Sequence, residues 1–184
     1  MTEIPGYIAG KWDIDAVHSE VGFTVKHMMV SKVRGRFDKF EGTIVTGDRP
    51  EDSSVIASID ANSINTHNEQ RDGHIRGADF FEVDKHPFWT FTSTAIRDVT
   101  PEGFVLDGDI TIKGVTRPVT FDVELNGIGP DAFGGTRIGF SAKTTISRGD
   151  FGVDFNGPIP GAPGGVILGE KVTVHLEIEG VLQD

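Results

Sequence analysis

The sequence predicts an all-β protein, an antiparallel β-barrel of about eight strands with one principal helix. Apolar and polar residues alternate at strand period through most of the chain, the connections are short, and no repeat unit recurs. Glycine supplies 24 of the 184 residues, above the usual ~7%, which is typical of a β protein with many turns and bends. These features favour a barrel over a sandwich, and the length suits a single domain over residues 1–184.

The alternating segments give the predicted strands in chain order. They cover residues 10–17, 19–27, 33–37, 40–44, 55–61, 88–96, 104–112, 118–125, 138–146 and 172–178. The apolar row changes parity between Phe37 and Phe40, which predicts a bulge at that point. Residues 150–169 break the alternation with several prolines and glycines, so we expect a long loop that is functional or mobile.

Residues 65–87 lack strand period and contain the predicted helix. Thr66 followed by Glu69 has the spacing of a capping box, and Gly77 is placed to end the helix. One set of residues shares a face at helical spacing: His67, Arg71, His74 and Ala78. Because neither face is apolar enough to anchor the helix alone, and Phe80-Phe81 follows it, we expect a plug or lid over a β core.

Small residues in the inward-facing rows predict a hollow interior. They are Gly35, Gly42, Ala57, Ala61, Gly108 and Ala142. An eight-stranded barrel is just wide enough to fill itself with side chains or to hold one ligand, and a solid core favours bulkier residues at such positions. We therefore expect an apolar tunnel that binds a ligand. Its predicted lining residues are Val21, Phe23, Val25, His27, Met28, Met29, Phe37, Phe40, Ile59, Phe80, Phe81, Phe91, Leu106, Ile110, Phe121, Phe140 and Val174.

The composition excludes several classes of function. A formal charge of −11 argues against a nucleic-acid partner and against simple electrostatic docking to anionic lipid, although a local basic patch is compatible with this total. The absence of cysteine excludes disulfides and thiol chemistry. The first residues have no signal-peptide pattern, and no later stretch reaches the roughly 18 apolar residues of a membrane span. We therefore expect a cytoplasmic protein with no integral membrane segment.

A series of motifs extends over nearly the whole chain. In order they are Trp12-Asp13-Ile14-Asp15, His18-Ser19, Val21-Gly22-Phe23, Val33-Arg34-Gly35-Arg36-Phe37, Phe40-Glu41-Gly42, Arg71-Asp72-Gly73-His74-Ile75-Arg76, Asp79-Phe80-Phe81, Gly108-Asp109-Ile110-Thr111-Ile112-Lys113-Gly114 and Arg148-Gly149-Asp150-Phe151-Gly152. Together they resemble the motifs of the YceI-like, or polyisoprenoid-binding, family. The resemblance implies a lipocalin-like barrel that holds a polyprenyl chain, an isoprenoid quinone or a related lipid, often as a homodimer and with no other cofactor required. The chain departs from the family's pattern in lacking the export signal of many members and in its longer loop at 153–169.

Arg71, His74 and Arg76 are the candidates to contact the head group of such a lipid. An arginine beside a quinone oxygen or a phosphate would donate charge-assisted hydrogen bonds. The alternative is structural, with Arg71 and Asp72 in charged pairs that tie the helix to the barrel. His27, on an apolar row, either meets the head group or is a hydrogen-bonded core histidine.

Two other functions stay open. One is an enzyme acting on a lipid-like substrate inside the barrel, with His27, His18 or the Arg71/Asp72/His74 group as acid or base. The other is a solid, filled barrel that acts only as an interaction module. Binding and sequestration or transport of a lipid, without catalysis, is the function that the sequence favours.

A catalytic triad and a metal site are both disfavoured. Asp15, His18 and Ser19 lie close in sequence, but adjacent residues on a strand point to opposite faces, so His18 cannot serve Ser19 locally. We expect His18 and Asp15 to satisfy backbone groups at a strand end. His67 and His74 would lie roughly 10 Å apart along the helix axis, too far to bind one metal ion together.

Overall fold

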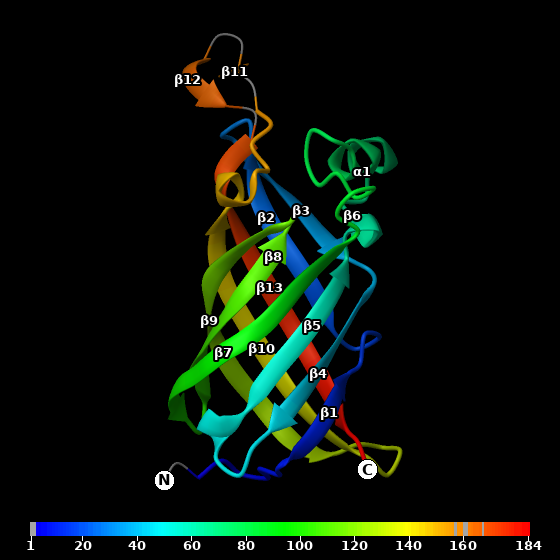
Figure 1. The fold of residues 1–184 in the computed structure, drawn as a ribbon, viewed down its shortest axis with the longest axis vertical. Helices are drawn as coiled ribbons and strands as arrows, with labels where there is room; N and C mark the ends of the chain where they lie inside the picture. The colour runs from blue at the N-terminus through cyan, green and yellow to red at the C-terminus, as the bar shows by residue number, and fades with distance from the viewer. Residues whose placement is uncertain (1–2, 157, 160–161, 167) are drawn as a thin grey trace.

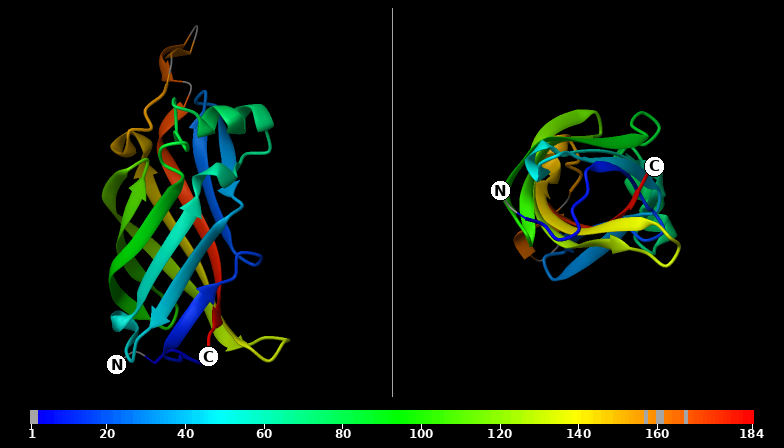
Figure 2. Two further views of the ribbon diagram at one scale, coloured as in Figure 1. Left: turned by 45° about the vertical axis from the view of Figure 1, so that its right-hand side comes forward. Right: turned by 90° about the horizontal axis from the view of Figure 1, so that it is seen from below.

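The computed structural model describes residues 3–156, 158–159, 162–166 and 168–184. Eight antiparallel strands form a closed ring in the order β1-β4-β5-β7-β8-β9-β10-β13, and β13 pairs back with β1 (Figure 1). Their bounds are β1 Gly10–Ile14, β4 Phe40–Thr46, β5 Ser54–Asp60, β7 Phe88–Thr100, β8 Gly103–Ile112, β9 Val115–Pro130, β10 Thr136–Ser147 and β13 Leu168–Leu182. The predicted all-β antiparallel barrel is confirmed, and seen along its axis the strands surround the centre as a ring (Figure 2).

Three additional strands extend one end of this ring, which we call the upper end because it lies at the top of Figure 1. They are β2 Glu20–His27, β3 Ser31–Phe37 and β6 Ile64–Asn65. β2 pairs with the first part of β13, and β1 pairs with its last residues, so β1 and β2 act as one long strand broken at 15–19. In the same way β3 and β4 are broken at 38–39, and β5 and β6 at 61–63.

The predicted bulge between Phe37 and Phe40 is therefore wrong. The chain leaves the ladder at this point and re-enters it beside a different strand, because β3 pairs with β2 and β6 whereas β4 pairs with β1 and β5. The two breaks support each other, since Asp38 N donates to Ser63 O at 3.1 Å and Asp60 N donates to Lys39 O at 3.0 Å.

The upper end of the barrel is closed by a helix instead of by strand pairing. Among the described strands, β6 has only two residues and pairs only with β3, so the ladder does not continue from β6 to β7. The helix α1, Glu69–Arg76, lies beside β6 (Figure 1), and the turn after it buries Phe80, Phe81 and Val83 in the main core. No helix among the described residues has the length and apolar character needed to cross a bilayer.

The helix begins later than the capping-box spacing predicts. Asn68 is the N-cap, and its side chain accepts a hydrogen bond from Arg71 N at 3.0 Å. His67 has a positive φ of 61°, which interrupts the helical path, so His67 does not lie on the helix as expected. Ala78 does not lie on the helix either, because it follows the C-cap Gly77. Thr66 instead donates its backbone N–H and its hydroxyl to buried Asp72. Gly77 ends the helix as predicted.

Shorter elements complete the chain. They are the 3-10 turns η1 Pro50–Asp52, η2 Ala61–Ser63 and η3 Arg148–Phe151, and the hairpin strands β11 Pro158–Ile159 and β12 Ala162–Val166. The stretch at 150–169, expected to be one long loop, thus contains part of η3 and a hairpin that projects beyond the upper end (Figure 1). Residues 157, 160, 161 and 167 of that stretch lie outside the described residues.

Small wall residues accommodate aromatic rings. A Cβ placed on Gly35 would lie 2.4 Å from Cζ of Phe23, its cross-strand partner, and a Cβ on Gly108 would lie 2.4 Å from Cζ of Phe91. The space beside each of the two glycines is filled by an aromatic ring. The expectation that small inward residues leave the interior empty is therefore wrong at these two positions. The two glycines let a large ring lie against the sheet, which keeps the ring out of the middle of the barrel.

Gly35→Ala should force the Phe23 ring off the wall. We expect the free energy of unfolding to fall by about 1–3 kcal/mol, the usual cost of overpacking, as measured by urea denaturation. The matched control is Gly127→Ala, also on a strand, where an added Cβ meets nothing within 4 Å. Equal stability of the two variants would contradict this account of the glycines.

Candidate functional site

An apolar cavity of about 570 Å³ occupies the interior of the barrel. Fifteen of the predicted lining residues lie on its wall: Val21, Phe23, Val25, His27, Phe37, Phe40, Ile59, Phe80, Phe81, Phe91, Leu106, Ile110, Phe121, Phe140 and Val174. They come from strands all around the ring and from the turn after α1. The barrel is thus hollow, and the interlocked interior of a filled barrel is not observed.

Many wall residues were missed, although most follow from the same alternation. Val123 and Leu125 continue the row of Phe121, and Leu176 and Ile178 continue the row of Val174. Other missed residues carry no periodic signal because they come from irregular segments. These are Ile4 and Tyr7 near the N-terminus, and Arg148, Phe151, Val153 and Phe155 at or after η3.

Met28 and Met29, expected on the wall, do not lie there. They form the turn between β2 and β3, where both have positive φ and are 46% and 54% exposed. The inward row ends at His27 because the chain reverses direction immediately after it. His27 itself lies on the wall, and within the described residues its imidazole makes no hydrogen bond.

A buried tryptophan and the N-terminal segment lie at the lower end. Trp12 is fully buried against Ile44 and Ile138, and its Nε1 donates to Thr46 Oγ1 at 2.9 Å. The N-terminal segment crosses below the ring (Figure 2), and the Tyr7 hydroxyl donates to Gly47 O at 2.6 Å. The hydroxyl groups of Tyr7, Thr46 and Ser53 belong to residues that line the cavity here, and each is hydrogen-bonded within the protein.

Three aromatic rings meet at the upper end of the cavity. The ring centroid of His74 lies 5.1 Å from that of Phe80 and 5.3 Å from that of Phe155, and the two phenylalanines are 5.1 Å apart. These residues come from α1, from the turn after it and from the segment after η3. The contact thus joins the two segments that cover the mouth of the tunnel.

Arg71 also lies on the upper wall. Its Nε donates to Thr66 Oγ1 at 2.8 Å and its Nη2 to Thr66 O at 2.7 Å, while Nη1 makes no hydrogen bond to a described residue. Asp72 is buried, binds Thr66 and does not reach the wall. The expected tie between helix and barrel therefore passes through Thr66 and not through an Arg71–Asp72 ion pair.

The two remaining head-group candidates differ in position. His74 lies on the wall, with Nε2 2.9 Å from Asp79 Oδ2. Arg76 lies off the wall, where its Nε donates to Asn62 O at 3.1 Å and Nη1 lies 3.6 Å from Glu69 Oε1. Helical spacing turns Arg76 away from the face that carries Arg71 and His74. Its contacts are with other residues of the protein, so we assign it a structural role.

Arg148 is a buried cation at the same end that the candidate residues did not include. It donates from Nε to Gly169 O at 2.9 Å, and from Nη1 to Val153 O at 2.8 Å and to Phe155 O at 2.9 Å. Within the described residues it has no carboxylate partner. These bonds fix the segment that brings Phe155 to the tunnel mouth.

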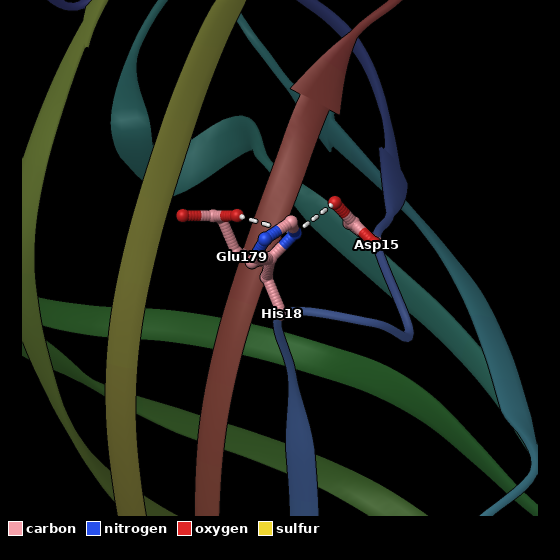
Figure 3. Close-up of side chains that lie close together, drawn as sticks. All are labelled: Asp15, His18 and Glu179. Atoms are coloured by element: carbon pink, nitrogen blue, oxygen red, sulfur yellow. Dashed lines mark hydrogen bonds and ion pairs between the residues drawn. The ribbon is translucent and has the colours of Figure 1, made fainter. Parts of the chain in front are cut away.

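Asp15, His18 and Glu179 form a polar cluster where β1 and β2 separate (Figure 3). His18 Nδ1 lies 2.7 Å from Asp15 Oδ2 and 3.6 Å from Glu179 Oε2. Ser19 does not complete a triad, because its Oγ accepts from Glu179 N at 2.9 Å. The expectation that Asp15 and His18 satisfy backbone groups is correct for Asp15, whose Oδ1 accepts from Val17 N at 3.0 Å. It is wrong for His18, whose ring contacts the carboxylates of Asp15 and Glu179 instead.

The same cluster has the donor atoms of a metal site, since its three ligand atoms lie within 4.8 Å of one another. A cation of the protein already occupies it, however. Arg137 Nη1 lies 2.7 Å from both Asp15 Oδ2 and Glu179 Oε2, and its Nε lies 2.8 Å from Asp131 Oδ2. The Arg137 hydrogen bond, followed by that of His18, holds the pKa of Asp15 well below its usual value. We interpret the cluster as an ionic clasp on the strand seam.

The chain is similar to known proteins over most of its length. A family model described as the YceI-like domain matches residues 12–180. The UPF0312 protein SA2479 of Staphylococcus aureus is 40% identical over 168 residues, which cover 90% of this chain and 94% of the relative.

Solved structures share the fold. The YCEI protein of Campylobacter jejuni is 28% identical over the full length of both chains, with a TM-score of 0.73. BcnA of Burkholderia cenocepacia is 23% identical with a TM-score of 0.77, covering 90% of this chain and 98% of BcnA. A domain of Saccharophagus degradans described as polyisoprenoid-binding is 17% identical with a TM-score of 0.69, covering 96% of this chain and all of that domain.

Asp15→Asn should weaken the clasp in a pH-dependent way. Because the pKa of Asp15 is lowered in the folded protein, its contribution to stability is present above pH ~4, where unfolded aspartate is ionised, and is lost as the pH falls further. At neutral pH we expect a loss of about 1–2 kcal/mol in the free energy of unfolding, measured by urea denaturation.

The control for this variant is Asp13→Asn on the same strand. Asp13 is exposed and has no ion pair among the described residues, so its replacement should change little. The clasp would be refuted if the difference between wild type and Asp15→Asn were equally large in acid and at neutral pH.

Proposed function

The chain belongs to the YceI-like family, and from this membership and the geometry of its tunnel we propose that it binds a long-chain isoprenoid lipid. The ligand would be a polyprenyl chain or an isoprenoid quinone, which the protein sequesters or carries without catalysing a reaction. The observation that carries the proposal is the enclosed apolar wall, to which strands all around the ring contribute.

The dimensions of the tunnel suit a long and thin ligand. Its volume of about 570 Å³ is within the range of small-molecule sites, ~300–1,000 Å³. β13 has 15 residues, so it spans roughly 50 Å along its own direction and, at a tilt of ~40°, roughly 40 Å along the barrel axis. A polyprenyl tail matches this elongated shape better than a compact ligand does.

Burial of the tail supplies most of the affinity. At ~0.8 kcal/mol for each carbon removed from water, an isoprene unit of five carbons contributes about 4 kcal/mol. The loss of translational and rotational freedom costs ~4–15 kcal/mol, which about four buried units offset, and each further buried unit strengthens retention. No charged group is needed along the tail, in agreement with the apolar wall.

The upper end is where a polar head group would lie. Arg71 Nη1 and the ring of His27 make no hydrogen bond within the described residues, and His74 lies nearby on the same wall. These groups could donate to a quinone oxygen or a phosphate, whereas the hydroxyls of Tyr7 and Thr46 at the lower end are already hydrogen-bonded within the protein. We therefore place the head group at the upper end and the tail toward Trp12.

The known relatives support the choice of ligand class. The Saccharophagus degradans domain is described as polyisoprenoid-binding, and at 17% identity its likeness to this chain is one of fold. Isoprenoids are therefore the first ligands to test. The cytoplasmic location, the homodimer and the lack of a nucleic-acid partner stay predictions from the sequence.

Native mass spectrometry and organic extraction of freshly purified protein test the proposal. We expect a co-purified isoprenoid, or uptake of an added quinone or polyprenyl alcohol. Ala142→Phe, which adds a ring to the tunnel wall, should reduce the amount of bound lipid several-fold because it fills space that the tail needs.

The matched control is Ala132→Phe, which adds the same ring in the exposed turn between β9 and β10 and should retain the lipid. If wild-type protein from several hosts carries no lipid and takes up none, the proposed function is wrong. Conversion of an added ligand to a product would favour the enzyme alternative.

Arg71→Gln should weaken head-group recognition and spare the tail. We expect at least about tenfold lower affinity for an isoprenoid quinone, the scale of one hydrogen bond to a charged group. Affinity for an isoprenoid hydrocarbon without oxygen should change little, which serves as the control for correct folding. Equal losses for both ligands, measured by fluorescence titration, would assign Arg71 a purely structural role.

A further inference from the structure

The β2–β3 hairpin differs in charge from the rest of the molecule. Apart from Glu20 at its first position, the hairpin has four cations and no aspartate or glutamate, whereas the whole chain has a formal charge of −11. The cations are Lys26, Lys32, Arg34 and Arg36, and all four are exposed. They lie on the outer face of the two strands, because alternate residues of the same strands line the tunnel.

Three of these cations have no carboxylate partner in the part of the chain that the structure describes. Lys26 lies directly opposite Lys32 in the ladder, an arrangement in which like charges destabilise a pair of strands. Neither lysine nor Arg34 has an ion pair or a side-chain hydrogen bond to another described residue, and only Arg36 has a carboxylate partner, Asp38 at 2.9 Å. The hairpin therefore presents an unpaired basic surface suited to an anionic partner.

The tip of the hairpin is apolar and conformationally costly. Met28, Met29 and Val30 are 46%, 54% and 88% exposed. Met28 and Met29 have φ of 51° and 63°, a conformation for which hairpin turns favour asparagine and glycine. A turn selected for stability alone would contain those residues, so the exposed methionines point to a role outside the fold.

The tip lies at the mouth of the proposed lipid tunnel. It projects at the upper end of the barrel, the end that carries α1 and the β11–β12 hairpin (Figure 1). His27, the residue before the tip, lines the cavity and pairs with Leu168 at the start of β13. A surface that contacts the tip therefore also faces the tunnel mouth.

We propose that the β2–β3 hairpin docks the protein on an anionic lipid bilayer. Met28, Met29 and Val30 insert among the head groups while the neighbouring cations contact lipid phosphates, the combination that holds amphipathic segments at membrane interfaces. The net charge alone predicts the opposite, but the charge is unevenly distributed. Docking does not depend on the tunnel ligand, and only its use in exchanging lipid with the tunnel rests on the proposed function.

Co-sedimentation with vesicles tests the basic surface. Wild type should bind vesicles of phosphatidylcholine mixed with phosphatidylglycerol, bind pure phosphatidylcholine weakly, and lose affinity as salt is added. Lys26→Gln/Lys32→Gln should bind the anionic vesicles about 10- to 30-fold more weakly, since each cation near such a surface is worth about fivefold. Lys11→Gln/Lys143→Gln changes the net charge equally, at exposed positions outside the hairpin, and should bind like wild type.

A second variant separates docking from folding. Met28→Asn/Met29→Gly gives the turn its preferred residues, so stability should be equal or higher while binding to anionic vesicles falls several-fold. Phe133→Ser removes a side chain that is 86% exposed in the β9–β10 turn and should leave binding unchanged.

Insertion can also be observed directly, because the chain has no cysteine. A polarity-sensitive dye on Val30→Cys should shift to the blue on anionic vesicles, whereas the same dye on Phe133→Cys should not. Absence of binding by wild type, or undiminished binding by both hairpin variants, would overturn the proposal. Retention of a short nucleic acid or a protein by the basic surface in place of vesicles would also overturn it. Lipid extraction from the same samples tests the tunnel separately.

Discussion

The structure depends on closure of the ladder between β1 and β13. Only three residue pairs form this seam, Trp12↔Leu182, Asp13↔Val181 and Ile14↔Gly180. A closed ring fixes the side-chain alternation of every strand at once, so each strand must give one face to the interior. Trp12 fills the inner side of the seam, and Arg137 with its three carboxylates clasps it nearby. The tunnel exists because this short seam is held from both faces.

The two ends of the barrel are built differently, and this gives the tunnel a direction. Below, the ladder is complete, and Trp12 packs inside it against Ile44 and Ile138. Above, β6 ends after two residues, so backbone pairing gives way to α1 and to the segment held by Arg148. Polar groups are tolerated there because side chains and carbonyls satisfy them locally, as Thr66 does for Arg71. The contact of His74 and Phe80 with Phe155 is made by side chains alone, so it can open without breaking strand pairing.

Strand period was sufficient to predict the barrel and part of its wall. Thirteen of the fifteen predicted residues on the wall lie on strands, where a period of two leaves no choice once one member of a row is buried. Phe80 and Phe81 are the exceptions, since they lie in the turn after α1. The failures occur where the period stops. A positive φ at His67 moves the helix start to Asn68, and a tight turn removes Met28 and Met29 from the row of His27. Phe155 lies in a segment without regular structure, which a hydrogen bond from Arg148 to Phe155 O holds at the wall. Because this contact has no periodic pattern in the sequence, the position of Phe155 could not be predicted.

The uneven distribution of charge limits how the protein can approach an anionic surface, which the net charge alone does not show. A protein of net charge −11 is repelled as a whole from an anionic surface, so it approaches such a surface only by its basic part. On this barrel the unpaired cations surround an apolar tip at the upper end, and the opposite end has none of that combination in the part of the chain that the structure describes. Repulsion of the acidic body therefore works together with attraction of the hairpin, and both turn the tunnel mouth toward the bilayer. Because surface charges act over roughly 8–10 Å at physiological salt, this orientation is imposed only near contact and stays reversible, which suits the proposed exchange of lipid with a bilayer.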